Sequence, residues 1–156
     1  MTDRPCSSPE AGQLDFWLGG WDLSWPAEQT GGDAGETATG SNRIERLFGQ
    51  CVIEENFATD DAQFLGRSLS VFDEAAGLWR QTWVDSSGGY IALTGGKDGE
   101  DFELRTDPAD RDGRLVVNRM VFSEITTDSL LWSWQTSPDD GATWRDLWTI
   151  DYRRRV

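Results

Sequence analysis

Hydrophobic and polar residues alternate in short runs along most of this chain. In residues 20–25 every second side chain is apolar, which is the pattern of a strand with one buried face. Residues 129–136 and 143–152 are rich in aromatic and β-branched residues and contain no Gly or Pro. The turn-forming sequence Ser-Pro-Asp-Asp-Gly-Ala at 137–142 separates them, so the two segments predict a β-hairpin.

The same pattern recurs often enough to predict ten strands joined by short turns. Turn signals, such as Asp-Ser-Ser-Gly-Gly at 85–89, follow one another at regular intervals, and no long crossover connection interrupts the series. Such an antiparallel up-and-down succession favours closure, because a closed barrel has no unpaired sheet edge. The sequence therefore predicts an all-β fold, a closed antiparallel up-and-down β-barrel of about ten strands. The expected strands are 20–25, 40–47, 50–58, 64–72, 78–84, 90–94, 101–106, 114–125, 129–136 and 143–152.

Three segments lie outside this series. Residues 9–18 predict one short N-terminal helix, because apolar residues recur there at three- and four-residue intervals and two glycines follow. Residues 1–9 are polar and are expected to form a disordered tail. Residues 26–39 predict a polar, Gly-rich and mobile loop. A length of 156 residues suits one domain, so we expect residues 10–156 to form a single barrel.

The charge of the chain limits its partners. Its 28 acidic and 14 basic residues give a formal net charge of −14. Such a surface repels phosphate backbones and anionic lipids, so we expect neither nucleic-acid nor membrane binding. No run is as long as a membrane span, and the polar N-terminus does not resemble a signal peptide, so a cytoplasmic location is expected.

The chain contains no histidine, which removes several kinds of chemistry. His-ligated haem, the usual catalytic zinc sites and the Ser-His-Asp triad all require this residue. We expect no cofactor and no metal site. Of the two cysteines, Cys6 lies in the polar tail and Cys51 in a strand-like run, and the sequence leaves open whether they form a bridge.

The nine tryptophans suggest what the barrel interior could do. Aromatic side chains on inward-facing positions can line a ligand cavity, and a few polar side chains would orient its occupant. They can equally fill the interior as ordinary core, since barrels of this size do either. If a cavity exists, the expected ligand-binding residues are Gln81, Trp83, Arg119, Trp134, Gln135, Trp148 and Tyr152.

Two polar residues in apolar strands carry specific expectations. Glu55 is in phase with Ile53 and Phe57, so we expect an interior carboxyl with a raised pKa, a weak candidate for a catalytic general base. Arg119 could hold a ligand's carboxylate. Apolar residues occur on both sides of its strand, however, and the pattern does not decide which face of 114–125 is interior.

The order of several motifs resembles a known family. Phe-Trp-Leu-Gly-Gly-Trp-Asp at 16–22 is followed by Trp-Arg-Gln-Thr-Trp-Val-Asp-Ser-Ser-Gly at 79–88 and by a terminal Tyr152-Arg153. This order resembles bacterial proteins of unknown function with a lipocalin-like, or calycin-like, β-barrel. The resemblance implies a cup-like interior of the kind that holds small hydrophobic molecules. The outline also resembles nitrobindin-type barrels, but those bind haem through a histidine that this chain lacks.

Residues 137–144 match the Asp-box hairpin S-x-D-x-G-x-T-W seen in sialidases, where it is a structural turn. A single copy cannot build a propeller, so we expect the same structural role here.

Three functions remain open at this point. The first is binding of a small, mostly apolar ligand, with or without a carboxylate. The second is an enzyme acting on a small apolar carboxylate or carbonyl compound with Glu55 as general base. The third is a filled structural barrel that acts through self-association, for example as a homodimer.

Overall fold

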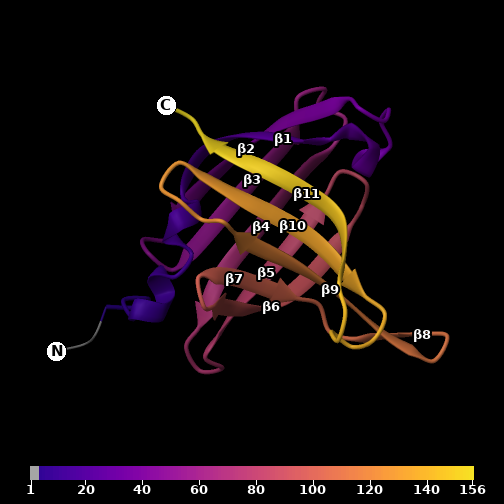
Figure 1. Ribbon diagram of the computed structural model, residues 1–156. Coiled ribbons are helices and arrows are strands. Elements are labelled where there is room, and N and C mark those ends of the chain that lie inside the picture. Colours follow the sequence, from indigo (N-terminus) through magenta and orange to yellow (C-terminus); the bar gives the residue numbers. More distant parts are fainter. Residues whose placement is uncertain (1–3) are drawn as a thin grey trace.

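Strands that follow one another in the sequence pair side by side, and the last strand returns to the first (Figure 1). The computed structural model describes residues 4–156. Strands β1 to β7 and β9 to β11 form one closed antiparallel ring, because β11 pairs with β1 and β10 pairs with both β9 and β11. The predicted ten-stranded barrel is confirmed. Its strands are β1 (Gly19–Pro26), β2 (Thr37–Leu47), β3 (Val52–Thr59), β4 (Leu65–Asp73), β5 (Leu78–Asp85), β6 (Tyr90–Asp98), β7 (Asp101–Arg105), β9 (Arg114–Ser123), β10 (Ser129–Ser137) and β11 (Arg145–Arg154).

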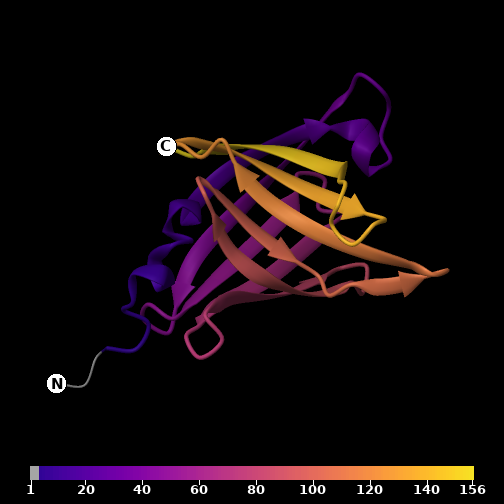
Figure 2. The same cartoon turned by 60° about the horizontal axis from the view of Figure 1, so that its bottom comes forward.

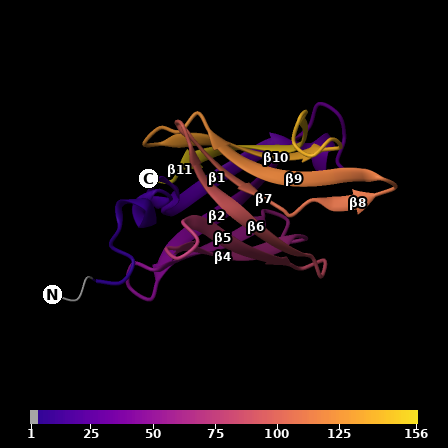
Figure 3. The same ribbon diagram turned by 90° about the horizontal axis from the view of Figure 1, so that it is seen from below.

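One short strand, β8 (Ala109–Arg111), lies between the expected strands 101–106 and 114–125, where no strand was predicted. It pairs only with the beginning of β9, and this hairpin extends away from the barrel (Figures 2 and 3). Asp112 and Gly113 make the turn with positive φ angles of 56° and 82°. All three residues of β8 are exposed. With no buried face, the strand leaves no alternating pattern in the sequence, which is why it was not predicted.

The predicted N-terminal helical segment is present as two consecutive 3₁₀ helices, η1 (Pro9–Gly12) and η2 (Asp15–Trp17). Ser8 caps the first through its side-chain oxygen, which accepts from the Ala11 amide. The Trp17 ring packs edge-on against Phe122, with ring centroids 5.2 Å apart. The segment therefore covers one end of the barrel.

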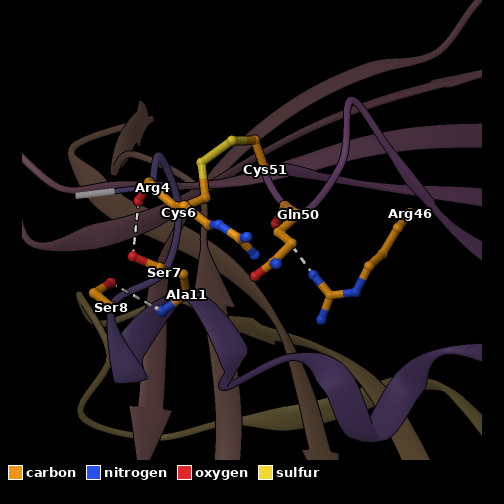
Figure 4. The surroundings of a disulfide bond; sticks show 8 residues. All are labelled: Arg4, Cys6, Ser7, Ser8, Ala11, Arg46, Gln50 and Cys51. Atoms are coloured by element: carbon orange, nitrogen blue, oxygen red, sulfur yellow. Dashed lines mark hydrogen bonds between the residues drawn. A yellow bond between two sulfur atoms is a disulfide. The ribbon is translucent and has the colours of Figure 1, made fainter. Parts of the chain in front are cut away.

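A disulfide joins Cys6 to Cys51 (Figure 4). It ties the segment before η1 to the turn between β2 and β3, 45 residues away in the sequence. Of the tail predicted to be disordered, residues 1–3 lie outside the described residues. The predicted loop at 26–39 contains a third 3₁₀ helix, η3 (Ala27–Thr30), and the start of β2. Its mobility stays a prediction.

Side chains fill the barrel interior at the end covered by η1 and η2. The alternation of buried and exposed residues along the strands follows the predicted faces, with Trp21, Leu23 and Trp25 all buried. On β9 it is Met120 and Phe122 that face inward, which resolves the orientation that the sequence left open. Within residues 4–156, none of the helices has the length and apolar character needed to span a bilayer.

Candidate functional site

The other end of the barrel contains a cavity of about 160 Å³. It lies where β10 ends, β11 begins, and β3 turns into β4. Most of its wall is aromatic and is formed by Phe57, Phe64, Trp83, Trp132, Trp134, Trp148 and Tyr152. The remaining lining is apolar, from Ile91, Leu93, Met120 and Ile150, except for two carboxyl groups, Glu55 and Asp85.

Strand alternation and close ring packing position these aromatic side chains. Trp132 and Trp134 project from the inner face of β10, and Trp148 projects from the inner face of β11. The Trp148 ring stands edge-on to Trp132 and Phe57, at a centroid distance of 5.7 Å in each case. Its indole N–H is buried and has no hydrogen-bond partner among residues 4–156.

Trp83 depends on a glycine for its position. The ring lies against Gly66 of the neighbouring strand, where a Cβ atom would overlap the indole. Its Nε1 donates to Asp85 Oδ2 at 2.9 Å. Asp85 Oδ1 in turn accepts from the amides of Ser87 and Gly89. Partial desolvation opposes ionisation of Asp85, but the bonds from Ser87, Trp83 and Gly89 together hold its pKa below the usual range, so this carboxylate is anionic at neutral pH.

Glu55 lies in the cavity wall, and its side chain is bonded to neighbouring strands. Asn42 Nδ2 donates to Oε2 at 2.6 Å, and Ser68 Oγ donates to Oε1 at 2.8 Å. Asn42 Nδ2 also donates to the Tyr152 hydroxyl at 3.0 Å. Glu55 is only 6% exposed, and burial raises its pKa to about 7 against the lowering effect of the bonds from Asn42 and Ser68. The predicted interior position and raised pKa of this carboxyl are confirmed.

Tyr152 stays protonated in this setting. Burial, and secondarily the nearby charge of Glu55, raise its pKa above the ordinary value for a tyrosine. The cavity therefore contains one group, Glu55, that can gain or lose a proton near neutral pH.

The seven residues expected to bind a ligand fall into three groups. Trp83, Trp134, Trp148 and Tyr152 line the cavity together. Gln81 is buried on the same inner surface but outside the cavity lining, where its Nε2 donates to Ser70 Oγ at 2.9 Å.

The remaining two, Arg119 and Gln135, lie outside the cavity lining. Arg119 Nε donates to Gln135 Oε1 at 2.7 Å, and its Nη1 is 3.1 Å from Glu103 Oε2. The guanidinium also stacks on Trp144, 3.9 Å from the ring centroid. The structure thus separates this basic group from the cavity.

Several lining residues were not singled out from the sequence. Trp132 shares a strand face with Trp134, so alternation alone could have included it. Asn42 does not line the cavity but bonds Glu55; it is in phase with Ile44 on β2, which marks it as an interior polar residue. Asp85 and Phe64 gave no such signal, because they lie at a strand end and in a turn, where the alternating pattern stops.

The Asp-box hairpin between β10 and β11 has the expected structural role. Asp139 accepts from the side chain and amide of Thr143 and from the Ser137 hydroxyl, and these bonds lower its pKa to about 2. Trp144 packs beneath the guanidinium groups of Arg105 and Arg119. The hairpin is a turn with its polar groups satisfied, and it lies outside the cavity.

Comparison with known proteins places the chain in a family without giving it an activity. No curated protein matches the chain. Residues 8–154 match the family described as "Protein of unknown function (DUF1579)". The match runs from the N-terminal cap of η1 to the last residue of β11. The chain therefore belongs to the DUF1579 family of proteins of unknown function.

Proposed function

We propose that this protein is a lipocalin-like barrel that binds a small, mostly apolar molecule in the cavity between β3, β5, β10 and β11. The observation that carries the proposal is the contrast between the two ends of the interior. Large side chains fill one end, whereas the other end is hollow and has aromatic walls. A filled structural barrel would need no such space, because protein interiors are normally packed as densely as organic crystals.

The size of the cavity limits the ligand. A cavity of about 150 Å³ lined by apolar side chains holds one benzene molecule. The 160 Å³ available here therefore suits a single ring or a short alkyl chain. Trp83, Trp134, Trp148 and Tyr152 would contact the ligand, while Gln81, Arg119 and Gln135 would support the barrel around it.

The proposal is tested by comparing the native and denatured mass of the purified protein, followed by titration with toluene and benzyl alcohol. We expect either a bound small molecule or quenching of tryptophan fluorescence that saturates with probe concentration. Ile91→Trp would fill the cavity from its wall and abolish quenching. Val84→Trp adds the same ring at an exposed position on β5 and serves as the matched control. Ligand binding would be contradicted if the purified protein held no small molecule and neither probe quenched its tryptophan fluorescence. Unchanged probe binding by Ile91→Trp would also contradict it.

A second candidate function is acid–base catalysis, and the position of Glu55 favours it. A carboxyl group with a pKa of about 7 that faces an apolar cavity can act as a general base near neutral pH. Cyclohexanone in D₂O provides a simple substrate for proton abstraction next to a carbonyl. We expect the protein to accelerate loss of its α-proton NMR signal, half-maximally near pH 7, and Glu55→Gln to abolish the effect. Equal rates of α-proton exchange with and without the protein would contradict this hypothesis.

The cytoplasmic location stays a prediction, and the disulfide weighs against it. Cytosolic reductants keep most thiols reduced, whereas disulfides persist in oxidising compartments. Alkylation of the cells' proteins before lysis, followed by mass measurement of this chain, decides the redox state of Cys6 and Cys51 in vivo.

A further inference from the structure

We propose that the ligand carries an amine, and that its ammonium group pairs with the Glu55 carboxylate inside the aromatic cavity. This inference rests on the proposed function, because it specifies the chemical class of the molecule that the cavity binds. It replaces the expectation of a carboxylate ligand, which depended on Arg119.

The first support is the sign of the charges around the cavity. Its lining includes two carboxyl groups, Glu55 and Asp85, and neither Lys nor Arg. Arg119, the candidate anchor for an acid, is occupied by Gln135 and Glu103 away from the cavity. A ligand carboxylate would therefore add a negative charge next to two others, in a protein whose net charge is already −14.

The second support is the unused bonding capacity of Glu55. Each of its oxygens accepts one hydrogen bond, from Asn42 or from Ser68, although a carboxylate oxygen can accept two. Both donors are neutral, so the buried group has no opposite charge to compensate it when ionised. An ammonium group has three donors and no acceptor. It would supply both the missing donors and the missing charge.

The third support is the character of the walls. An ammonium group that enters an apolar cavity loses its hydration, and aromatic faces can replace part of it through cation–π attraction. Tryptophan is the best side chain for this purpose, and four tryptophans line the cavity: Trp83, Trp132, Trp134 and Trp148. A cavity with aromatic walls and a carboxylate at its border thus fits a small cation better than a small anion.

The pairing makes binding depend on pH. The other titratable groups that line the cavity are Tyr152 on β11 and Asp85 on β5. The pKa of Tyr152 is raised and that of Asp85 is lowered, so neither changes its charge near neutrality. Glu55, with a pKa of about 7, is half protonated there. An amine should therefore bind about tenfold more tightly at pH 8 than at pH 6, and it should displace a proton at the lower pH.

Calorimetry with benzylamine, benzyl alcohol and benzoate tests the inference on the intact oxidised protein. These probes share one ring and differ in charge. At pH 8 we expect benzylamine to bind at least tenfold more tightly than benzyl alcohol, and benzoate not to bind. Glu55→Gln should reduce the benzylamine affinity tenfold or more and leave that of benzyl alcohol within threefold. The control Glu54→Gln removes the same charge from the neighbouring residue, which alternates to the outer face, and should change neither affinity.

The outcomes separate the two proposals. If benzyl alcohol or benzoate binds as tightly as benzylamine, the cavity binds ligands but the amine inference is overturned. If none of the probes binds, the proposed function fails and the amine inference fails with it. Should Glu55→Gln not fold, the wild-type protein still decides the question, because identical benzylamine affinities at pH 6 and pH 8 contradict pairing with Glu55.

Discussion

At the scale of single residues, Glu55 is where burial and charge conflict most directly. The side chain lies inside the barrel because it is in phase with Ile53 and Phe57 on β3. Asn42 and Ser68 satisfy one acceptor site on each oxygen, but no opposite charge is bonded to it. The protein therefore holds this carboxyl at a pKa of about 7 instead of the ordinary 4.5. The group is consequently a source of pH-dependent stability as well as a candidate ligand contact.

The sign of that dependence follows from proton binding. Between pH 4.5 and 7 the unfolded chain has released the Glu55 proton while the folded barrel retains it, so the free energy of unfolding falls as pH rises. The stabilisation that the Glu55 proton gives the folded state is fully present below pH 4.5 and is lost as the pH rises past 7. At about 1.4 kcal/mol per pKa unit, the loss is about 3 kcal/mol. Urea unfolding of the wild type and Glu55→Gln measures this. From pH 4.5 to pH 8, the free energy of unfolding of the variant should rise by that amount relative to that of the wild type. A stability difference between the two proteins that does not change with pH would contradict the prediction.

At the scale of elements, the contact between β4 and β5 sets the shape of the cavity. Gly66 pairs with Asp85 across these strands, and the ring of Trp83 lies in the space that a side chain at residue 66 would occupy. The glycine is a requirement of packing, since its φ angle is not in the left-handed region. One strand thus leaves room for an aromatic side chain of its neighbour, and this side chain forms a wall of the cavity.

Gly66→Ala should therefore destabilise the barrel and displace Trp83. Over-packing of this kind costs roughly 1–3 kcal/mol, which urea unfolding would measure. Gly96→Ala, on β6, is the matched control, because the added carbon would only be in ordinary contact with Trp79, at 3.7 Å. The idea fails if the two variants lose equal stability or if tryptophan fluorescence is unchanged in Gly66→Ala.

At the scale of the whole molecule, the ring of strands and the disulfide stabilise the fold in different ways. The ring closes through backbone pairing of β11 with β1 and of β10 with β9. The disulfide joins the N-terminal segment to the turn after β2, outside this ring. We infer that the barrel forms without the bond and that the bond adds stability by restricting the unfolded chain.

Reduction, or the double substitution Cys6→Ser and Cys51→Ser, should leave the β-sheet circular dichroism spectrum intact. The free energy of unfolding should fall by roughly 2–4 kcal/mol, the usual contribution of a bridge that closes a loop of this length. Urea unfolding with and without reductant measures the difference. A reduced protein that is fully unfolded in buffer would show instead that the bond is required for folding.

The strands and their inner faces could be read from the sequence because their signal is local. Alternation with a period of two places Trp21, Trp83 and Glu55 on buried faces whatever the partner strands are. The same reasoning could not orient Arg119, since apolar residues occupy both sides of β9, nor could it detect β8, which buries nothing. It could not decide on the disulfide either, because bridging depends on the distance between Cys6 and Cys51 in the folded chain.

The sequence by itself determined an all-β chain, ten of its strands, the inward-facing side chains of the strands that alternate clearly, and a buried acid at residue 55. Only the tertiary structure decided which of these side chains meet and whether they leave space between them. Asn42 bonds both Glu55 and Tyr152 because β11 closes the ring against β1, which places residues 42 and 152 two strands apart. The cavity, likewise, depends on how side-chain volumes from many strands add up at one end of the barrel, and no local pattern encodes that sum.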